Sequence, residues 1–144
     1  MSFDISQINC PKIAVDAVII LENFRGYKTP DVVLIKRKYP PLGLALPGGF
    51  VDYGESLEIA VAREVREETG LVFHDFHQLT ARSDPDRDQR GHIISVPFWG
   101  YGKGIPVAND DAKEIILIKK TEIMMQKFAF PDHAKMALEF VFAH

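Results

Sequence analysis

Acidic side chains recur at a regular spacing between residues 49 and 71, in the segment GFVDYGESLEIAVAREVREETGL. The residues of interest are one arginine and four glutamates: Glu55, Arg63, Glu64, Glu67 and Glu68. Most residues from 57 to 69 are good helix formers, so we predict a helix of about 20 Å that Ser56 caps and Gly70 ends. At about 100° per residue, the glutamates at 64, 67 and 68 share one face beside an apolar face. Such a helix can present carboxylates to a cation while it packs on a core.

A metal site has to be weighed against an ordinary solvated helix face. Arg63 and Glu67 form an i,i+4 pair that would stabilise such a face. Glu64 and Glu68, however, are a like-charge i,i+4 pair, and the last helical turn disfavours anions. A bound divalent cation would offset both costs, and clustered carboxylate oxygens suit Mg²⁺, with Mn²⁺ as the alternative.

The spacing of the segment resembles the Nudix box, G-x5-E-x7-R-E-U-x-E-E-x-G-U with U aliphatic, and every specified position is filled. Nudix enzymes hydrolyse a nucleoside diphosphate linked to another moiety. The resemblance implies metal ligands at four positions: Glu64, Glu67, Glu68 and the backbone carbonyl of Gly48 in the loop 47–49. It also implies that Glu55 supports the ligands and that Arg63 orients the glutamates. Glu67, Glu64 and Arg63 are therefore our catalytic candidates.

Three segments outside the box are similar to bacterial and archaeal ADP-ribose pyrophosphatases. They are the lead-in 34–52, the stretch SDPDRDQRGH at 83–92, and FPDHA at 130–134. A proline about fifteen residues beyond the box marks the subgroup, and Pro85 stands there. The chain departs from the pattern at three places: Gln89 replaces a proline, Leu44 stands where tryptophan is common, and Pro97 interrupts a strand, which predicts an edge or a bulge.

Substrate binding is assigned to four residues: Arg37, Arg87, Arg90 and Asp86. The arginines can offer planar forks to a diphosphate. In the alternative, the loop 83–92 lies on the surface and its aspartates, Asp84, Asp86 and Asp88, neutralise the arginines. The general base is left open between Glu67 and a carboxylate of the region 110–114. The aromatic residues 98–101 either stack an adenine or, as is usual for such a strand, belong to the core.

Length and composition predict one domain over residues 1–144, large enough to bury about two-thirds of its unfolded surface. The net charge of −3 is not that of a dedicated nucleic-acid binder. The lone Cys10 excludes an internal disulfide framework and fits a reducing compartment. Without a leader or a long apolar run, the protein is expected in the cytoplasm and away from membranes. A homodimer is left open.

Strands are expected at 12–21, 32–38, 73–82, 92–101 and 114–119, with a polar loop over 23–31. A final helix should start at Asp132, with Met136, Phe140 and Val141 on its apolar side. These elements indicate an α/β protein with a mixed β-sheet between helices, and the resemblance implies the Nudix-type α/β/α sandwich.

The expected function is Mg²⁺-dependent hydrolysis of ADP-ribose to AMP and ribose 5-phosphate. Two alternatives stay open. One is a nucleoside triphosphate pyrophosphatase, which would share the whole box; the other is a ligand-sensing Nudix module without activity, which the complete set of box carboxylates disfavours.

Overall fold

The computed structural model describes residues 4, 8–22 and 31–143. Most of the predicted loop 23–31 lies outside this part; its last residue, Asp31, begins a strand. The described elements, in chain order, are β1 (Lys12–Leu21), β2 (Asp31–Arg37), β3 (Leu44–Ala45), β4 (Gly48–Phe50), α1 (Leu57–Thr69), β5 (Val72–Gln78), β6 (Ile93–Lys103), β7 (Ala112–Lys119), the 3₁₀ helix η2 (Lys120–Met125) and α2 (Asp132–Ala143).

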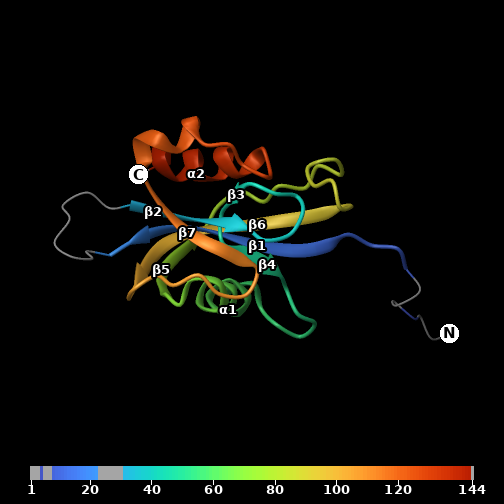
Figure 1. Cartoon of the computed structure of the whole chain (residues 1–144). Helices are drawn as coiled ribbons and strands as arrows, with labels where there is room; N and C mark the ends of the chain where they lie inside the picture. Colours follow the sequence, from blue (N-terminus) through green and yellow to red (C-terminus); the bar gives the residue numbers. More distant parts are fainter. Residues whose placement is uncertain (1–3, 5–7, 23–30, 144) are drawn as a thin grey trace.

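The strands form a mixed sheet with one helix on each face, as Figure 1 shows for α1 below and α2 above. The order along the main path is β3-β2-β1-β6-β5, with β4 paired to β1 and β7 to β2. Strands β1 and β6 run parallel over their whole length, and the other pairs are antiparallel. The predicted α/β/α sandwich with a mixed sheet is therefore confirmed.

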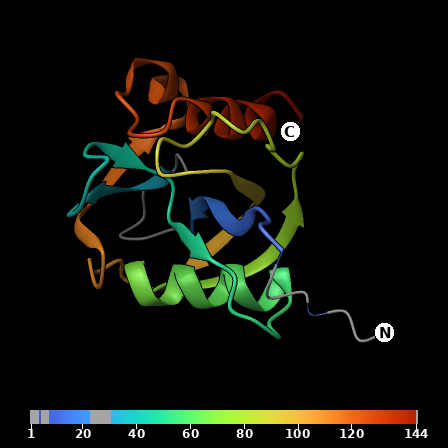
Figure 2. The same ribbon diagram turned by 90° about the vertical axis from the view of Figure 1, so that its right-hand side faces the viewer.

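Alternation along β1 divides the interior into two cores, because successive side chains of a strand point to opposite faces. Val15, Ala17 and Ile19 pack toward α1 with its Val61 and Val65. On the other face, Val18 and Ile20 pack with Met136 and Phe140 of α2. Both helices are thereby fixed against the same strand, which Figure 2 shows between them.

Local signals located most elements well. The helix 57–69, the strand 12–21 and the start of α2 at Asp132 lie where the sequence predicts them, whereas the other strand ends shift by a few residues. Two short strands were missed. One of them, β4, includes the glycines of the loop 47–49, and it pairs with β1 from Asp16↔Gly48 to Ala14↔Phe50.

The prediction that Pro97 marks a sheet edge is wrong, because β6 lies between β1 and β5. The carbonyl of Pro97 accepts a 2.8 Å hydrogen bond from the Leu79 backbone, just past the end of β5 at Gln78. The N and O of one strand residue point to the same side, so the N–H that Pro97 lacks would also point toward β5. The hydrogen bonding between β5 and β6 is already ending at this position, so little is lost. The register shift in this pair lies between His74 and His77 instead.

Of the three aromatic residues of β6, two belong to the core, whereas Tyr101 keeps 37% of its surface exposed. Phe98 and Trp99 are buried at 2% and 8% exposure, each in one of the two cores.

Across the described residues, no helix has the length and apolar character that a membrane crossing requires.

Candidate active site

The box helix α1 is closed at both ends by local contacts. The Ser56 hydroxyl accepts a hydrogen bond from Ile59 N, and Gly70 adopts a left-handed conformation with φ of 73°. Val61 and Val65 are buried against the sheet. The helix is thereby fixed so that its acidic face lies along β4.

Arg63 is the centre of a network on this face. Its Nε and Nη2 hold both oxygens of Glu55, at 2.7 and 2.9 Å, and Nη1 donates to Glu64 at 2.8 Å and to Glu67 at 3.1 Å. Nη2 also reaches the carbonyl of Phe50 at 3.1 Å. Hydrogen bonding from Arg63 lowers the pKa of Glu55 to about 2. The arginine therefore orients carboxylates and ties the helix to the end of β4.

Glu68 is buried, with 5% exposure, and its Oε2 accepts a 3.1 Å hydrogen bond from Gly48 N. Burial, followed by repulsion from the carboxylates of Glu64, Asp16 and Asp111, raises its pKa to about 8 despite that hydrogen bond. Burial also raises the pKa of Glu64, although Arg63 acts in the opposite direction. The site thus concentrates negative charge away from water at an energetic cost.

This donor set fits a divalent cation. Hard carboxylate oxygens beside a strand carbonyl match Mg²⁺ or Mn²⁺, and a cation would favour the ionised state that burial disfavours. A Cβ on Gly49 would lie 2.5 Å from the Glu64 carboxyl, so glycine is what lets β4 approach the acid. Within the described part of the chain, no three His, Cys, Asp or Glu side chains are already arranged to hold a metal. Substrate oxygens and water would have to complete the shell, as is common for Mg²⁺.

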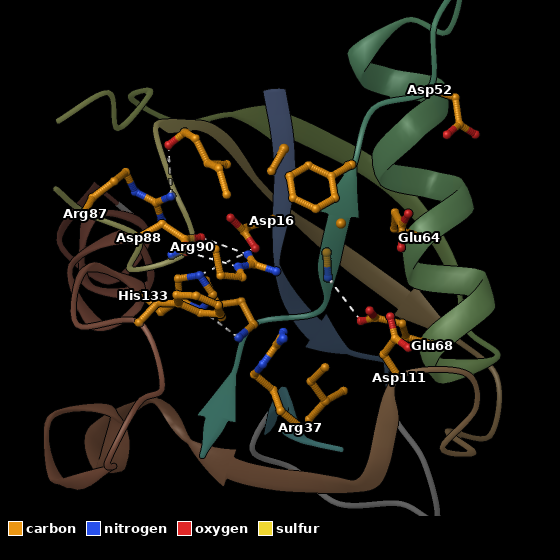
Figure 3. A pocket seen from close by; sticks show the side chains of 18 residues that line it. Asp16, Arg37, Asp52, Glu64, Glu68, Arg87, Asp88, Arg90, Asp111 and His133 are labelled. Atoms are coloured by element: carbon orange, nitrogen blue, oxygen red, sulfur yellow. Dashed lines mark hydrogen bonds and ion pairs between the residues drawn. The ribbon is translucent and has the colours of Figure 1, made fainter. Parts of the chain in front are cut away.

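A cavity of about 230 Å³ opens beside these carboxylates, and Figure 3 shows its opposing walls. Glu64, Glu68 and Asp111 lie on one side, while Arg37 and Arg90 come from elements across the cavity. Burial, and next the nearby Arg90, lowers the pKa of Arg37, whose Nε donates to Pro41 O at 2.8 Å. An acidic wall opposite a basic one can hold a cation and a phosphate together.

Three of the predicted site residues do not line this cavity: Arg63, Glu67 and Asp86. Glu67 is not among the lining residues, its side chain is 46% exposed, and it contacts Arg63. Asp86 is exposed and lines a different cavity, beside Arg82 and Lys135. Of the carboxylates in the region 110–114, Asp111 lines the main cavity, whereas Glu114 pairs with Lys36 at 3.4 Å.

The arginines of the loop 83–92 line the cavity but already have carboxylate partners. Arg87 holds Asp132 of α2 through Nε at 2.5 Å and Nη2 at 3.0 Å, and its side chain is only 6% exposed. Arg90 forms a similar fork with Asp88, at 3.0 and 2.8 Å. The neutralisation considered for this loop therefore occurs for Arg90, whereas the partner of Arg87 comes from a distant helix.

A buried polar group, of which Asp16 and His133 line the cavity, was not predicted from the sequence. The Ser95 hydroxyl donates a very short hydrogen bond to Asp16, whose other oxygen lies 3.5 Å from His133 Nε2. His133 Nδ1 accepts from Leu46 N at 3.0 Å, which leaves the proton on Nε2 toward Asp16. A signal existed in the aspartate at the centre of the otherwise apolar strand KIAVDAVIIL. This group anchors the chain just before Gly48.

Comparisons with known proteins agree with this geometry. The model of the NUDIX domain matches residues 11–140. An ADP-ribose pyrophosphatase of Methanocaldococcus jannaschii is 42% identical over 134 residues, which cover 91% of this chain and 73% of that protein. The chain belongs to the Nudix family.

Solved structures show the same fold. The NUDIX domain of Shewanella oneidensis NrtR, complexed with ADP ribose, superposes with a TM-score of 0.85 at 24% identity, covering 98% of this chain and 93% of that one. A MutT/nudix family protein of Listeria innocua gives a TM-score of 0.71 at 32% identity, with coverage of 94% and 95%.

Proposed function

We propose that this Nudix hydrolase cleaves the pyrophosphate bond of ADP-ribose to give AMP and ribose 5-phosphate, with Mg²⁺ as the preferred cation. The observation that carries this proposal is the cavity in which the buried Glu68 faces Arg37. The 42% identity to an ADP-ribose pyrophosphatase supports the choice of substrate.

We assign the residues of the site to cation binding or to phosphate binding by their positions in the cavity. Glu64, Glu68 and the Gly48 carbonyl would hold the cation, with Glu67 as a further ligand and Arg63 as the group that orients the acids. When bound, a divalent cation polarises phosphate oxygens and lowers the pKa of water. Arg37 would receive a phosphate oxygen on the opposite wall, since a guanidinium binds phosphate with two donors.

Asp111 is the general base that the cavity favours. It lines the cavity next to Glu68, and a carboxylate there can accept a proton from the attacking water. The water oxygen then bonds to one phosphorus atom while the bridging oxygen leaves with the other phosphate.

We also propose that the chain acts as one domain in the cytoplasm; a homodimer stays a prediction.

Product identification tests the substrate. Wild-type protein should release AMP and ribose 5-phosphate from ADP-ribose in Mg²⁺, and chelation should stop the reaction. Pyrophosphate released preferentially from a nucleoside triphosphate would assign the chain to nucleotide-pool hydrolysis instead. Binding of ADP-ribose without turnover in Mg²⁺ and in Mn²⁺ would mean a ligand-sensing module.

A further inference from the structure

The main cavity is too small for a whole nucleoside diphosphate derivative. Its volume is about 230 Å³, whereas pockets for ligands of this size have roughly 300 to 1,000 Å³. Its walls also mix apolar side chains with many charged ones. The part of the substrate that carries the nucleobase therefore needs another place.

A second cavity, of about 530 Å³, adjoins the first. Phe50, Arg90 and Ile93 line both cavities and so form the partition between them. The rest of the second cavity comes from residues 9–12, Gly91 and His92. A third cavity, beside Asp86 and Lys135, has no aromatic ring in its lining.

Two members of the partition, Phe50 and Arg90, belong to a stack of planar groups. The Arg90 guanidinium lies between the rings of Phe50 and Phe130, at 5.4 and 5.1 Å from their centroids. Arg37 lies 5.1 Å from the Phe130 ring. Phe130 is therefore covered by two arginines and is only 5% exposed. Phe50 is different, because 39% of its surface is exposed and it also lines the second cavity, where Lys12 Nζ lies 5.9 Å from the centroid of its ring.

Strand β4 runs from the acidic site at Gly48 to Phe50, which lines the second cavity. Phe50 follows Gly48 by two residues on β4, roughly 7 Å along the strand. The register pairs Gly48 with Asp16 and Phe50 with Ala14, and all of these residues line the main cavity. Arg63 holds the Phe50 carbonyl at 3.1 Å. A ligand whose phosphate lies beside Gly48 thus extends along β4 to the Phe50 ring.

We propose that the second cavity is the nucleobase subsite and that Phe50 is its stacking platform. This inference rests on the proposed function. Planar bases stack on aromatic side chains, and Arg90 behind the ring fixes its orientation. The amide of Asn9, which also lines this cavity, can both donate to and accept from a base edge.

The two expected products form a matched pair for the test, because ribose 5-phosphate is AMP without its base. Dissociation constants for both are measured by calorimetry in Mg²⁺, on wild type and on Phe50→Leu and Phe50→Tyr. Leucine retains apolar volume but not the ring, so Phe50→Leu should bind AMP about five- to a hundredfold more weakly. Binding of ribose 5-phosphate should be unchanged, and Phe50→Tyr should retain AMP binding.

Tyr53→Ala, which removes a fully exposed ring nearby, is the matched control and should change neither constant.

Phe50→Leu with wild-type affinity for AMP, or with equal losses for both products, overturns the subsite. These outcomes are distinct from failure of the proposed function. If wild type releases no AMP from ADP-ribose while Phe50→Leu selectively loses AMP binding, the subsite stands and the reaction is another one.

Discussion

Gly48 N donates a 3.1 Å hydrogen bond to Oε2 of Glu68, so the middle residue of the Pro47-Gly48-Gly49 segment and the last turn of α1 are directly joined. The bond leaves the Gly48 carbonyl on a strand that runs past the acidic face. The same bond provides the buried Glu68 carboxyl with one hydrogen-bond donor in place of water. The stability of the metal-free site should therefore depend on the charge of this one acid.

Metal-free stability should fall as the pH rises through the window set by Glu68. Its pKa is raised by burial to about 8 from an ordinary 4.5. Between these values the folded state keeps a proton that the unfolded state has released, so the free energy of unfolding decreases with rising pH and levels off above about 8. A cation favours the ionised carboxylate, and its stabilising effect should grow over the same window.

Denaturant unfolding over this pH range, with chelator and with Mg²⁺, measures both effects. Glu68→Gln should lack the fall in stability that Glu68 causes over this window, so the slope of stability against pH should differ between the two proteins. Comparing them also cancels contributions from other groups such as His133. Equal slopes in both proteins would contradict the assignment of the titration to Glu68.

Replacing the box glutamates should separate turnover from folding. Glu68→Gln and Glu67→Gln each remove a charge directed at the metal, so most turnover should be lost, because the Lewis-acid contribution is worth several kcal/mol. Removing an anion from the last helical turn should leave thermal stability equal or higher. If either variant turns over near the wild-type rate in saturating Mg²⁺, the replaced residue is not a metal ligand. Glu67 is the more exposed of the two glutamates.

Among the arginines of the cavity, Arg37 should contribute most directly to binding of the substrate phosphate. Arg37→Ala should reduce kcat/KM for ADP-ribose by about ten- to a hundredfold, the contribution of a charged hydrogen bond of roughly 1.5 to 3 kcal/mol. Arg37→Lys should recover only part, since an ammonium cannot form the fork. Lys36→Ala removes the same charge from the adjacent, exposed position and should change kcat/KM little. Equal effects of the Lys36 and Arg37 variants would mean a general charge effect.

Arg87 should act mainly on stability. Because its side chain is buried in a fork with Asp132, Arg87→Ala should lower the free energy of unfolding by roughly 3 kcal/mol and leave that carboxylate without its partner. The double variant with Asp132→Ala should lose less than the sum of the two single losses. An Arg87→Ala protein with wild-type stability and a ten- to hundredfold loss on ADP-ribose alone would instead assign Arg87 to phosphate binding.

The sequence by itself determined what depends on local spacing. The helix 57–69, its caps and the convergence of the glutamates on one face follow from a period of 3.6 residues and from capping chemistry. The resemblance of the box and its flanking segments gave the family, which the match over residues 11–140 confirms. The segment 47–49 was predicted as a loop. Glycine has a low strand propensity, and Gly48–Phe50 is a strand because it pairs with β1.

Tertiary structure decided what depends on partners far away in the chain. Asp132 joins Arg87 across 45 positions, and Asp16 meets Ser95 across 79. The high pKa of Glu68 and the place of Phe50 between two cavities likewise arise only when separate elements meet. Burial and the charges of neighbours set these properties, and neither is encoded in the spacing of a motif.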